Sequence, residues 1–81
     1  SNYTMLYFDD QSKLLASRTL KDFEDILPAD TFFRIHNSNM INLNFIKKYI
    51  RGDGGQVEMT NGDSILVSRR KKDEFLKLIG R

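Results

Sequence analysis

Two short polar stretches carry the side chains of this sequence that are best suited to chemistry. The first, residues 34–39, is Arg-Ile-His-Asn-Ser-Asn, and the second, residues 68–72, is Ser-Arg-Arg-Lys-Lys. Amide, imidazole and hydroxyl groups can hydrogen-bond to phosphate oxygens or base edges, and Asn suits a bidentate contact with adenine. An Arg can fork onto guanine O6 and N7, whereas Lys contacts phosphate as a point charge. These residue types therefore indicate contact with a nucleic acid.

Each stretch also has a purely structural interpretation. Asn37 and Ser38 can close a turn through their own backbone, and a lone histidine such as His36 is often an ordinary hydrogen-bonded residue. Ser68 can be no more than the N-cap of a following helix, and residues 69–72 can form a solvated basic turn. However, cations at a helix N-terminus interact unfavourably with the helix dipole. Four consecutive cations at such a position therefore suggest that they have a function.

The sequence offers little for catalysis or metal binding. It has one histidine and no cysteine, and a hydrolytic triad would need a nucleophile motif that is absent. A metal site needs several convergent ligands, and the acidic pair Asp9-Asp10 falls in an expected turn. The glycines of residues 52–55 join two expected strands and lead no helix, so they do not form a phosphate loop. We therefore predict no enzyme activity, no cofactor and no metal site.

Length and charge point to one small domain with an anionic partner. The chain has 81 residues, of which 40% are hydrophobic and 30% charged, as in ordinary soluble domains. The absence of cysteine favours the cytoplasm, and no apolar run approaches the ~18 residues of a membrane span. The formal charge of +2 hides an asymmetry, since residues 1–33 carry −3 and residues 34–81 carry +5. A basic half suggests a polyanion.

The hydrophobic pattern predicts mostly short strands. Aromatic-rich residues 3–8 and residues 13–16 predict a hairpin joined by turn formers. Further strands are expected over residues 32–35, 40–43, 45–50, 56–60 and 64–67. Lys47 and Lys48 are expected to face solvent, whereas Val57 and Met59 are expected to point inward. The Asn61-Gly62 pair predicts a type I′ hairpin turn.

Two short helices complete the expected elements. The first is expected to begin at Thr19, with Asp22 near its N-terminus, and to end before Pro28. Leu20, Phe23 and Leu27 should form its buried face. Phe75, Leu76 and Ile79 mark a last helix of about two turns, and Gly80 should end it. About six short strands at hairpin spacing and two helices predict a mainly β fold, an antiparallel sandwich or open barrel.

The two polar stretches, in this order and context, resemble the LytTR family of bacterial DNA-binding domains. The matching segments cover nearly the whole chain: Asn2-Tyr3-Thr4, Ser17 to Lys21, Phe33 to Ser38, Ile41-Asn42-Leu43, Ile46, Gly54-Gly55, Asn61-Gly62 and Val67-Ser68-Arg69-Arg70. The resemblance implies an elongated antiparallel β fold that contacts successive grooves of DNA through loops and not through a recognition helix.

The resemblance also assigns residues to the DNA contact. Asn37 and Arg70 match loop positions that touch DNA, Arg69 and Lys71 are their expected phosphate neighbours, and a third contact is expected near Asn2 and Tyr3. Many members have a basic residue in place of Asn37 and an aromatic one in place of Asn39. The predicted DNA-binding residues are Asn2, Tyr3, His36, Asn37, Ser38, Asn39, Arg69, Arg70, Lys71 and Lys72.

Family members usually carry further strands before the segment that matches residues 2–4, and they are commonly joined to a receiver domain. We therefore expect residues 1–81 to be a LytTR-type domain that lacks its first N-terminal strands. The sheet edge left exposed could pair between chains, and a homodimer on repeated DNA sites is one expected form. The expected partners are double-stranded DNA and a receiver domain in the full-length protein, with no membrane.

The predicted function is sequence-specific binding of double-stranded DNA by the output domain of a bacterial two-component response regulator. Neutralising about four phosphates, with Lys47 or Lys48 contributing, would give a log–log salt slope near −3.6. One alternative is a protein-interaction module whose basic loop docks on an acidic partner. A second is a binder of RNA or single strands, which would want exposed aromatic residues for stacking, whereas most phenylalanines here follow core patterns.

Overall fold

The computed structural model describes residues 3–7, 13–52 and 54–80 of the chain, without the side chains of Tyr7 and Lys13. Its elements, in chain order, are β1 (Thr4–Tyr7), β2 (Lys13–Ala16), α1 (Leu20–Ile26), β3 (Phe32–His36), β4 (Asn39–Asn42), the 3-10 turn η1 (Leu43–Phe45), β5 (Ile46–Ile50), β6 (Gln56–Met59), β7 (Ser64–Leu66), the 3-10 turn η2 (Arg69–Lys71) and α2 (Lys72–Leu78). The expected mainly β fold with two short helices is confirmed.

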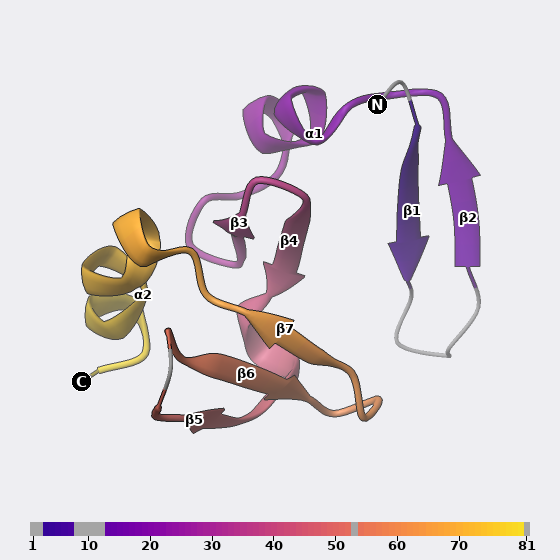
Figure 1. Cartoon of the computed structure of the whole chain (residues 1–81). Coiled ribbons are helices and arrows are strands. Elements are labelled where there is room, and N and C mark those ends of the chain that lie inside the picture. Colours follow the sequence, from indigo (N-terminus) through magenta and orange to yellow (C-terminus); the bar gives the residue numbers. More distant parts are fainter. Residues whose placement is uncertain (1–2, 8–12, 53, 81) are drawn as a thin grey trace.

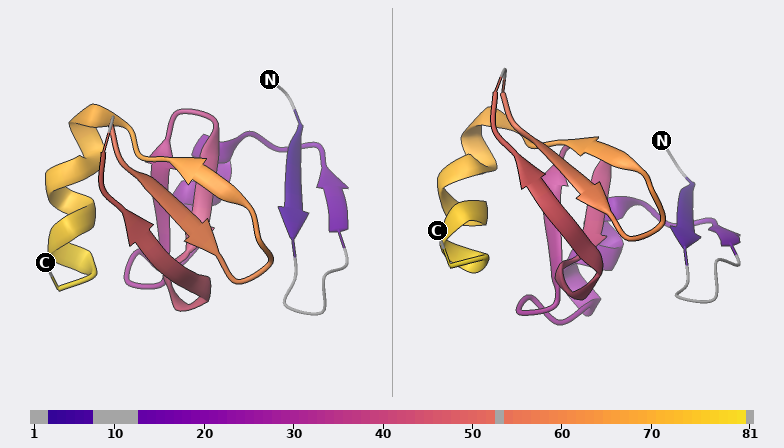
Figure 2. Two further views of the ribbon diagram at one scale, coloured as in Figure 1. Left: turned by 60° about the horizontal axis from the view of Figure 1, so that its bottom comes forward. Right: turned by 90° about the horizontal axis from the view of Figure 1, so that it is seen from below.

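Within the described residues, the strands form three small antiparallel sheets. β1 pairs with β2, β3 pairs with β4, and β5, β6 and β7 form a three-stranded sheet in that order. The β3–β4 hairpin lies behind the three-stranded sheet, and α2 covers one end of both (Figures 1 and 2). All strand pairs join neighbours along the chain, as expected from their hairpin spacing.

The hydrophobic core lies between the β3–β4 hairpin, the three-stranded sheet and α2. Side chains from all three close it, and the buried residues are Phe33, Ile35, Ile41, Val57, Met59, Val67 and Phe75. Phe75 is fully buried and stacks on Phe33 with ring centroids 5.9 Å apart. The prediction that Val57 and Met59 point inward is confirmed, because every second residue of β6 faces the core.

Two details of the three-stranded sheet depend on backbone irregularities. Lys47 and Lys48 are both exposed, as expected, although they are adjacent in one strand. The β5–β6 register shifts between Ile46 and Lys48, and such a bulge breaks the alternation of faces. The predicted type I′ turn at Asn61-Gly62 is wrong. Gly62 N donates to Met59 O and Met59 N to Asp63 O, so the loop has three residues, with Gly62 (φ 94°) at the position of a glycine bulge.

Helix α1 has the predicted start. Asp22 N donates to Thr19 Oγ1, and Thr19 N donates to Asp22 Oδ2, which makes a capping box. The expected buried face is only half-buried, because α1 lies beside β3 and outside the two core layers (Figure 1). On its outer side Lys21 bonds Asp25 at 3.0 Å, and this hydrogen bond raises the pKa of Lys21.

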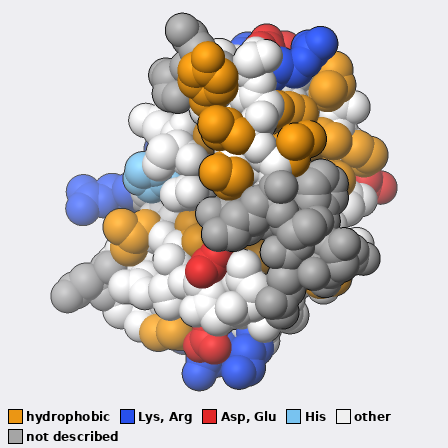
Figure 3. Space-filling view, turned by 90° about the vertical axis from the view of Figure 1, so that its right-hand side faces the viewer, with side chains coloured by type: hydrophobic (Ala, Val, Ile, Leu, Met, Phe, Trp, Pro, Cys, Tyr) orange, Lys and Arg blue, Asp and Glu red, His pale blue; other side chains and the backbone are white. Residues whose placement is uncertain are grey.

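The β1–β2 hairpin stands apart from the core (Figure 1). The Thr4 hydroxyl donates to the Arg18 carbonyl and ties the start of β1 to the segment after β2. Met5, Leu14 and Leu15 stay 44%, 54% and 58% exposed, and hydrophobic side chains gather on the face that this hairpin presents (Figure 3). The molecule is elongated, with extents of 34, 25 and 22 Å.

Candidate nucleic-acid interface

Asn37 and Ser38 form a tight turn between β3 and β4, with His36 opposite Asn39 in the last strand pair. The imidazole of His36 stabilises this turn, since its Nδ1 accepts a hydrogen bond from Ser38 N at 3.2 Å and lies 3.0 Å from Ser38 Oγ. His36 therefore has the structural role that the sequence left open, while Asn37, Ser38 and Asn39 are exposed.

Arg34 also stabilises this turn. Its Nη2 donates to the carbonyl oxygen of Asn37 at 2.7 Å, and its Nη1 lies 3.5 Å from Glu24 Oε1 on α1. Its Nε is buried and has no hydrogen-bond partner among the described residues. Arg34 belongs to the first polar stretch but was not among the predicted contact residues. The alternation of faces along a strand could have identified Arg34 as an outward-facing residue beside the turn, because it lies between the core residues Phe33 and Ile35.

Arg70 joins the second polar stretch to the first. Its Nη2 donates to Asn37 Oδ1 at 3.0 Å, across 33 residues of sequence. Because a guanidinium has only donors, the amide oxygen of Asn37 must face it, and the amide nitrogen is left for another acceptor. Ser68 N also donates to Ile35 O at 2.8 Å, which ties the second stretch alongside β3. The two polar stretches therefore lie side by side on one surface.

The four cations of residues 69–72 are not equivalent. Arg69 and Arg70 are exposed in η2, and Lys72 begins α2 half-buried. The Lys71 side chain is only 23% exposed, because its Nζ lies 5.6 Å from the centroid of the Phe33 ring and 3.9 Å from Glu74 Oε1. Ser68 occupies the cap position of η2, but its side chain makes no capping hydrogen bond, so it is not a side-chain cap.

The third expected contact is described only in part. Asn2 lies outside the described residues, and Tyr3, just before β1, is 60% exposed. In the left view of Figure 2, the β3–β4 turn, the start of α2 and the start of β1 all lie along the upper edge of the molecule. The described parts of the three predicted contact regions thus share one long edge.

A family model of the LytTr DNA-binding domain matches residues 1–80. The chain belongs to the LytTR family. It is therefore a DNA-binding domain, and the resemblance seen in its sequence is confirmed.

A solved structure supports the same assignment for this LytTR domain. It is described as the LytTr DNA-binding domain of a methyl-accepting/DNA response regulator from Bacillus cereus. The two chains are 28% identical, with a TM-score of 0.79, and the match covers 99% of this chain and 83% of that one. No curated protein matched.

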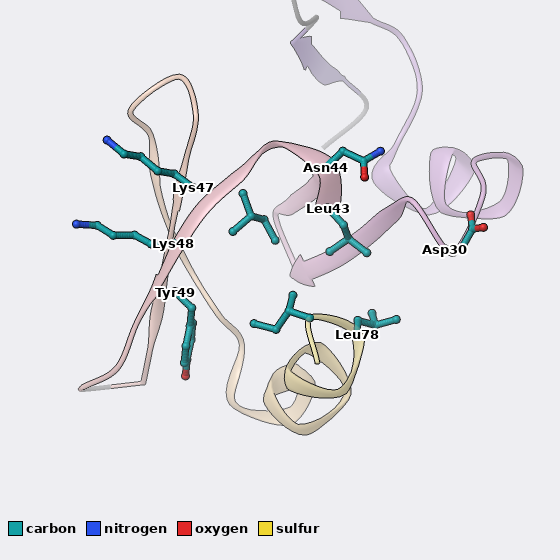
Figure 4. Close-up of a pocket in the computed structure, with 9 residues that line it drawn as sticks. Asp30, Leu43, Asn44, Lys47, Lys48, Tyr49 and Leu78 are labelled. Carbon is teal, nitrogen blue, oxygen red and sulfur yellow. The ribbon is translucent and has the colours of Figure 1, made fainter. Parts of the chain in front are cut away.

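Elsewhere the LytTR domain has a hollow of about 480 Å³ between β5 and α2. Leu43, Ile46 and Leu78 contribute apolar groups, but polar groups make up the larger part of its lining, and the side chains of Lys47 and Lys48 extend away from its centre (Figure 4). None of residues 34–39 or 68–72 lines it. In the part of the chain that the structure describes, no group of acidic residues and histidine could hold a metal ion.

No helix among the described residues is long and apolar enough to cross a membrane.

Proposed function

We propose that this LytTR domain binds double-stranded DNA sequence-specifically through the two polar stretches, as the output domain of a bacterial transcriptional response regulator that acts in the cytoplasm. The observation that carries the proposal is the 3.0 Å hydrogen bond between Arg70 and Asn37. It joins two loops, 33 residues apart in sequence, into one exposed polar unit beside a basic segment.

The paired side chains favour acceptor groups on DNA. Asn37 Oδ1 already accepts from Arg70, so Asn37 presents its amide N–H groups, and Arg70 presents its remaining guanidinium N–H groups. Guanine offers two acceptors, O6 and N7, in the major groove, whereas bidentate readout of adenine also needs an acceptor from the protein. The unit is therefore better suited to guanine or to phosphate than to the adenine contact that Asn37 alone would suggest.

The basic segment supplies the contacts to the DNA backbone. Arg69 and Lys72 have no carboxylate partner among the described residues, whereas Lys71 is shared with Glu74. Lys47 and Lys48 both pair with Glu58, at 3.5 and 3.6 Å. With Arg70 assigned to a base, Arg69, Lys71 and Lys72 remain for the backbone. Three phosphates would give a log–log salt slope of about −2.7.

The length of the domain suits contacts in successive grooves. Its longest extent is 34 Å, and one turn of B-DNA rises about 34–36 Å. A row of loops along this axis can reach the grooves on one side of the double helix. Tyr3 would make the contact at the far end of the row, with His36, Ser38 and Asn39 beside Asn37. Asn2, which lies outside the described residues, is proposed to contact DNA as well.

The test is the substitution Arg70→Ala, with the preferred site first selected from random duplexes. We expect specific binding to weaken by about 1–3 kcal/mol and discrimination to relax at one base pair. Lys77→Ala is the control, because Lys77 is an exposed cation of α2 outside both polar stretches. Fluorescence anisotropy with the selected and a random duplex measures both effects. Equal losses on the two duplexes would make Arg70 a phosphate contact.

The wider assembly is part of the same proposal. We expect a receiver domain to control the output domain in the full-length protein, and two copies to occupy repeated sites. The relative from Bacillus cereus, described as part of a response regulator, supports the first expectation. The apolar side chains exposed on β1 and β2 support the second. Sedimentation on duplexes with one or two sites would show whether the second copy binds cooperatively.

A further inference from the structure

A shallow cleft of about 340 Å³ lies where β5, the segment after it and α2 meet. It is lined by Tyr49, Arg51, Lys72 and Leu76. Lys72 belongs to the second polar stretch, whereas Tyr49 and Arg51 belong to neither stretch. The cleft therefore brings a second segment of chain up to the basic one.

The two cations of the cleft lack a carboxylate partner. Arg51 is exposed and Lys72 half-buried, and no acidic oxygen of the described residues lies within ion-pair distance of either. The nearby cations Lys47, Lys48 and Lys71 each pair with a glutamate. Because like charges at one cleft repel each other, an anion bound between Arg51 and Lys72 would stabilise the arrangement.

Tyr49 adds a neutral donor at the same cleft. Its ring packs against the buried Phe75, with centroids 5.9 Å apart. Its hydroxyl lies against the turn at Gly55, where a Cβ would come within 2.7 Å of the phenol oxygen. No hydrogen bond of the described residues uses this hydroxyl, so its O–H is free to donate to a ligand.

The cleft continues the surface of the two polar stretches. Val67 N donates to Gly55 O at 3.2 Å, so the β5–β6 turn lies next to the residue that precedes Ser68. Both views of Figure 2 show this turn beside the start of α2, on the same edge as the β3–β4 turn in the left view. A double helix laid along that edge would pass over the cleft.

We propose that this cleft binds a phosphate of the DNA backbone, with Arg51 and Lys72 neutralising it and the Tyr49 hydroxyl donating to it. The inference rests on the proposed function, since it adds Arg51 and Tyr49 to the contact surface of the same duplex. It needs no base-edge contact, so its contribution is the same for every DNA sequence.

Arg51→Gln tests the charge. The variant should bind the selected and a random duplex about fivefold more weakly, by the same factor, because an exposed charge contact is worth about 1 kcal/mol at most. The magnitude of its log–log salt slope should fall by about 0.9. Lys77→Gln removes a charge elsewhere on α2 and should change both quantities much less. Arg51→Gln and Lys77→Gln with equal effects would overturn the proposal.

Tyr49→Phe tests the neutral donor. This change keeps the ring on Phe75 and removes only the hydroxyl, so binding should weaken by about twofold, with an unchanged salt slope because no charge is lost. Thermal unfolding of each variant shows whether it is folded. If the wild-type domain binds no duplex at low salt, the proposed function itself fails. If it binds and Arg51→Gln behaves like Lys77→Gln, only the cleft fails, and an acidic peptide becomes the better candidate ligand.

Discussion

At the residue scale, the exposed side chain of Asn37 is held by two arginines from different parts of the chain. Arg34 fixes its backbone carbonyl and Arg70 its amide oxygen. The buried, unpaired Nε of Arg34 carries a desolvation cost of about 1–3 kcal/mol. Buried polar groups without a hydrogen-bond partner are rare in native proteins. Here the cost is explained by the role of Arg34 in positioning Asn37.

Asn37→Asp separates stability from DNA binding. A carboxylate would still accept from Arg70, and this exposed ion pair should leave the stability of the fold unchanged or raise it by up to about 1 kcal/mol. It would also remove the amide donors and place a negative charge next to phosphates, so DNA binding should be lost. Denaturant unfolding and anisotropy measure the two effects. Retained affinity with Asp at this position would contradict a DNA contact by Asn37.

Arg34→Lys should weaken specific DNA binding although the charge is kept. An ammonium group is a point donor and does not match the two directions in which Arg34 reaches Asn37 and Glu24. We expect a loss of about 1 kcal/mol or more in binding to the selected duplex, with a smaller loss on a random one. Lys21→Arg on α1 is the matched control. A variant that binds both duplexes like the wild type would remove Arg34 from the site.

At the element scale, the turn between β5 and β6 depends on a close approach of glycine and tyrosine. Gly55 has φ 82°, and its missing side chain leaves room for the Tyr49 hydroxyl. Gly54 has a similar φ of 78° but has open space where a Cβ would be. Substitution of Gly54 therefore tests only the need for a positive φ, whereas substitution of Gly55 also tests the need for space beside Tyr49.

Gly55→Ala should destabilise the domain more than Gly54→Ala. Both changes force alanine into the left-handed region, at about 1 kcal/mol, but only the first also displaces Tyr49, whose ring packs on Phe75. We expect the difference in unfolding free energy to be about 1–2 kcal/mol, typical of overpacking. Chemical denaturation measures it. Equal losses would mean that Tyr49 moves aside at little cost.

At the scale of the whole molecule, stability is divided unequally. β3 to β7 and α2 enclose the core, whereas β1 and β2 form a two-stranded sheet that contributes no residue to this core and leaves Met5, Leu14 and Leu15 exposed. An isolated hairpin is only marginally stable in water. We therefore expect the amides of β1 and β2 to exchange with solvent much faster than those of β6. Equal protection of β1 and β6 in the isolated domain would show that the hairpin is covered, for example by a second copy.

Much of this protein follows from local sequence. The capping box at Thr19, the alternation that buries Val57 and Met59, and the stop at Gly80 depend on interactions within a few residues, so they are predictable. The two polar stretches and the family also follow from the order of residue types. The turn at Asn61-Gly62 was mispredicted, because the same pair serves both a two-residue turn and a glycine bulge, and strand register decides between them.

Only the tertiary structure decided which of these residues meet. The packing of the β3–β4 hairpin on the three-stranded sheet brings Arg70 to Asn37, turns Lys71 onto Phe33 and places Arg51 at one cleft with Lys72. Periodicity and turn chemistry act over a few neighbouring residues, so they indicate only which side chains of a strand, helix or turn face solvent. Contacts between loops 33 residues apart depend on how the layers pack, which no local pattern encodes.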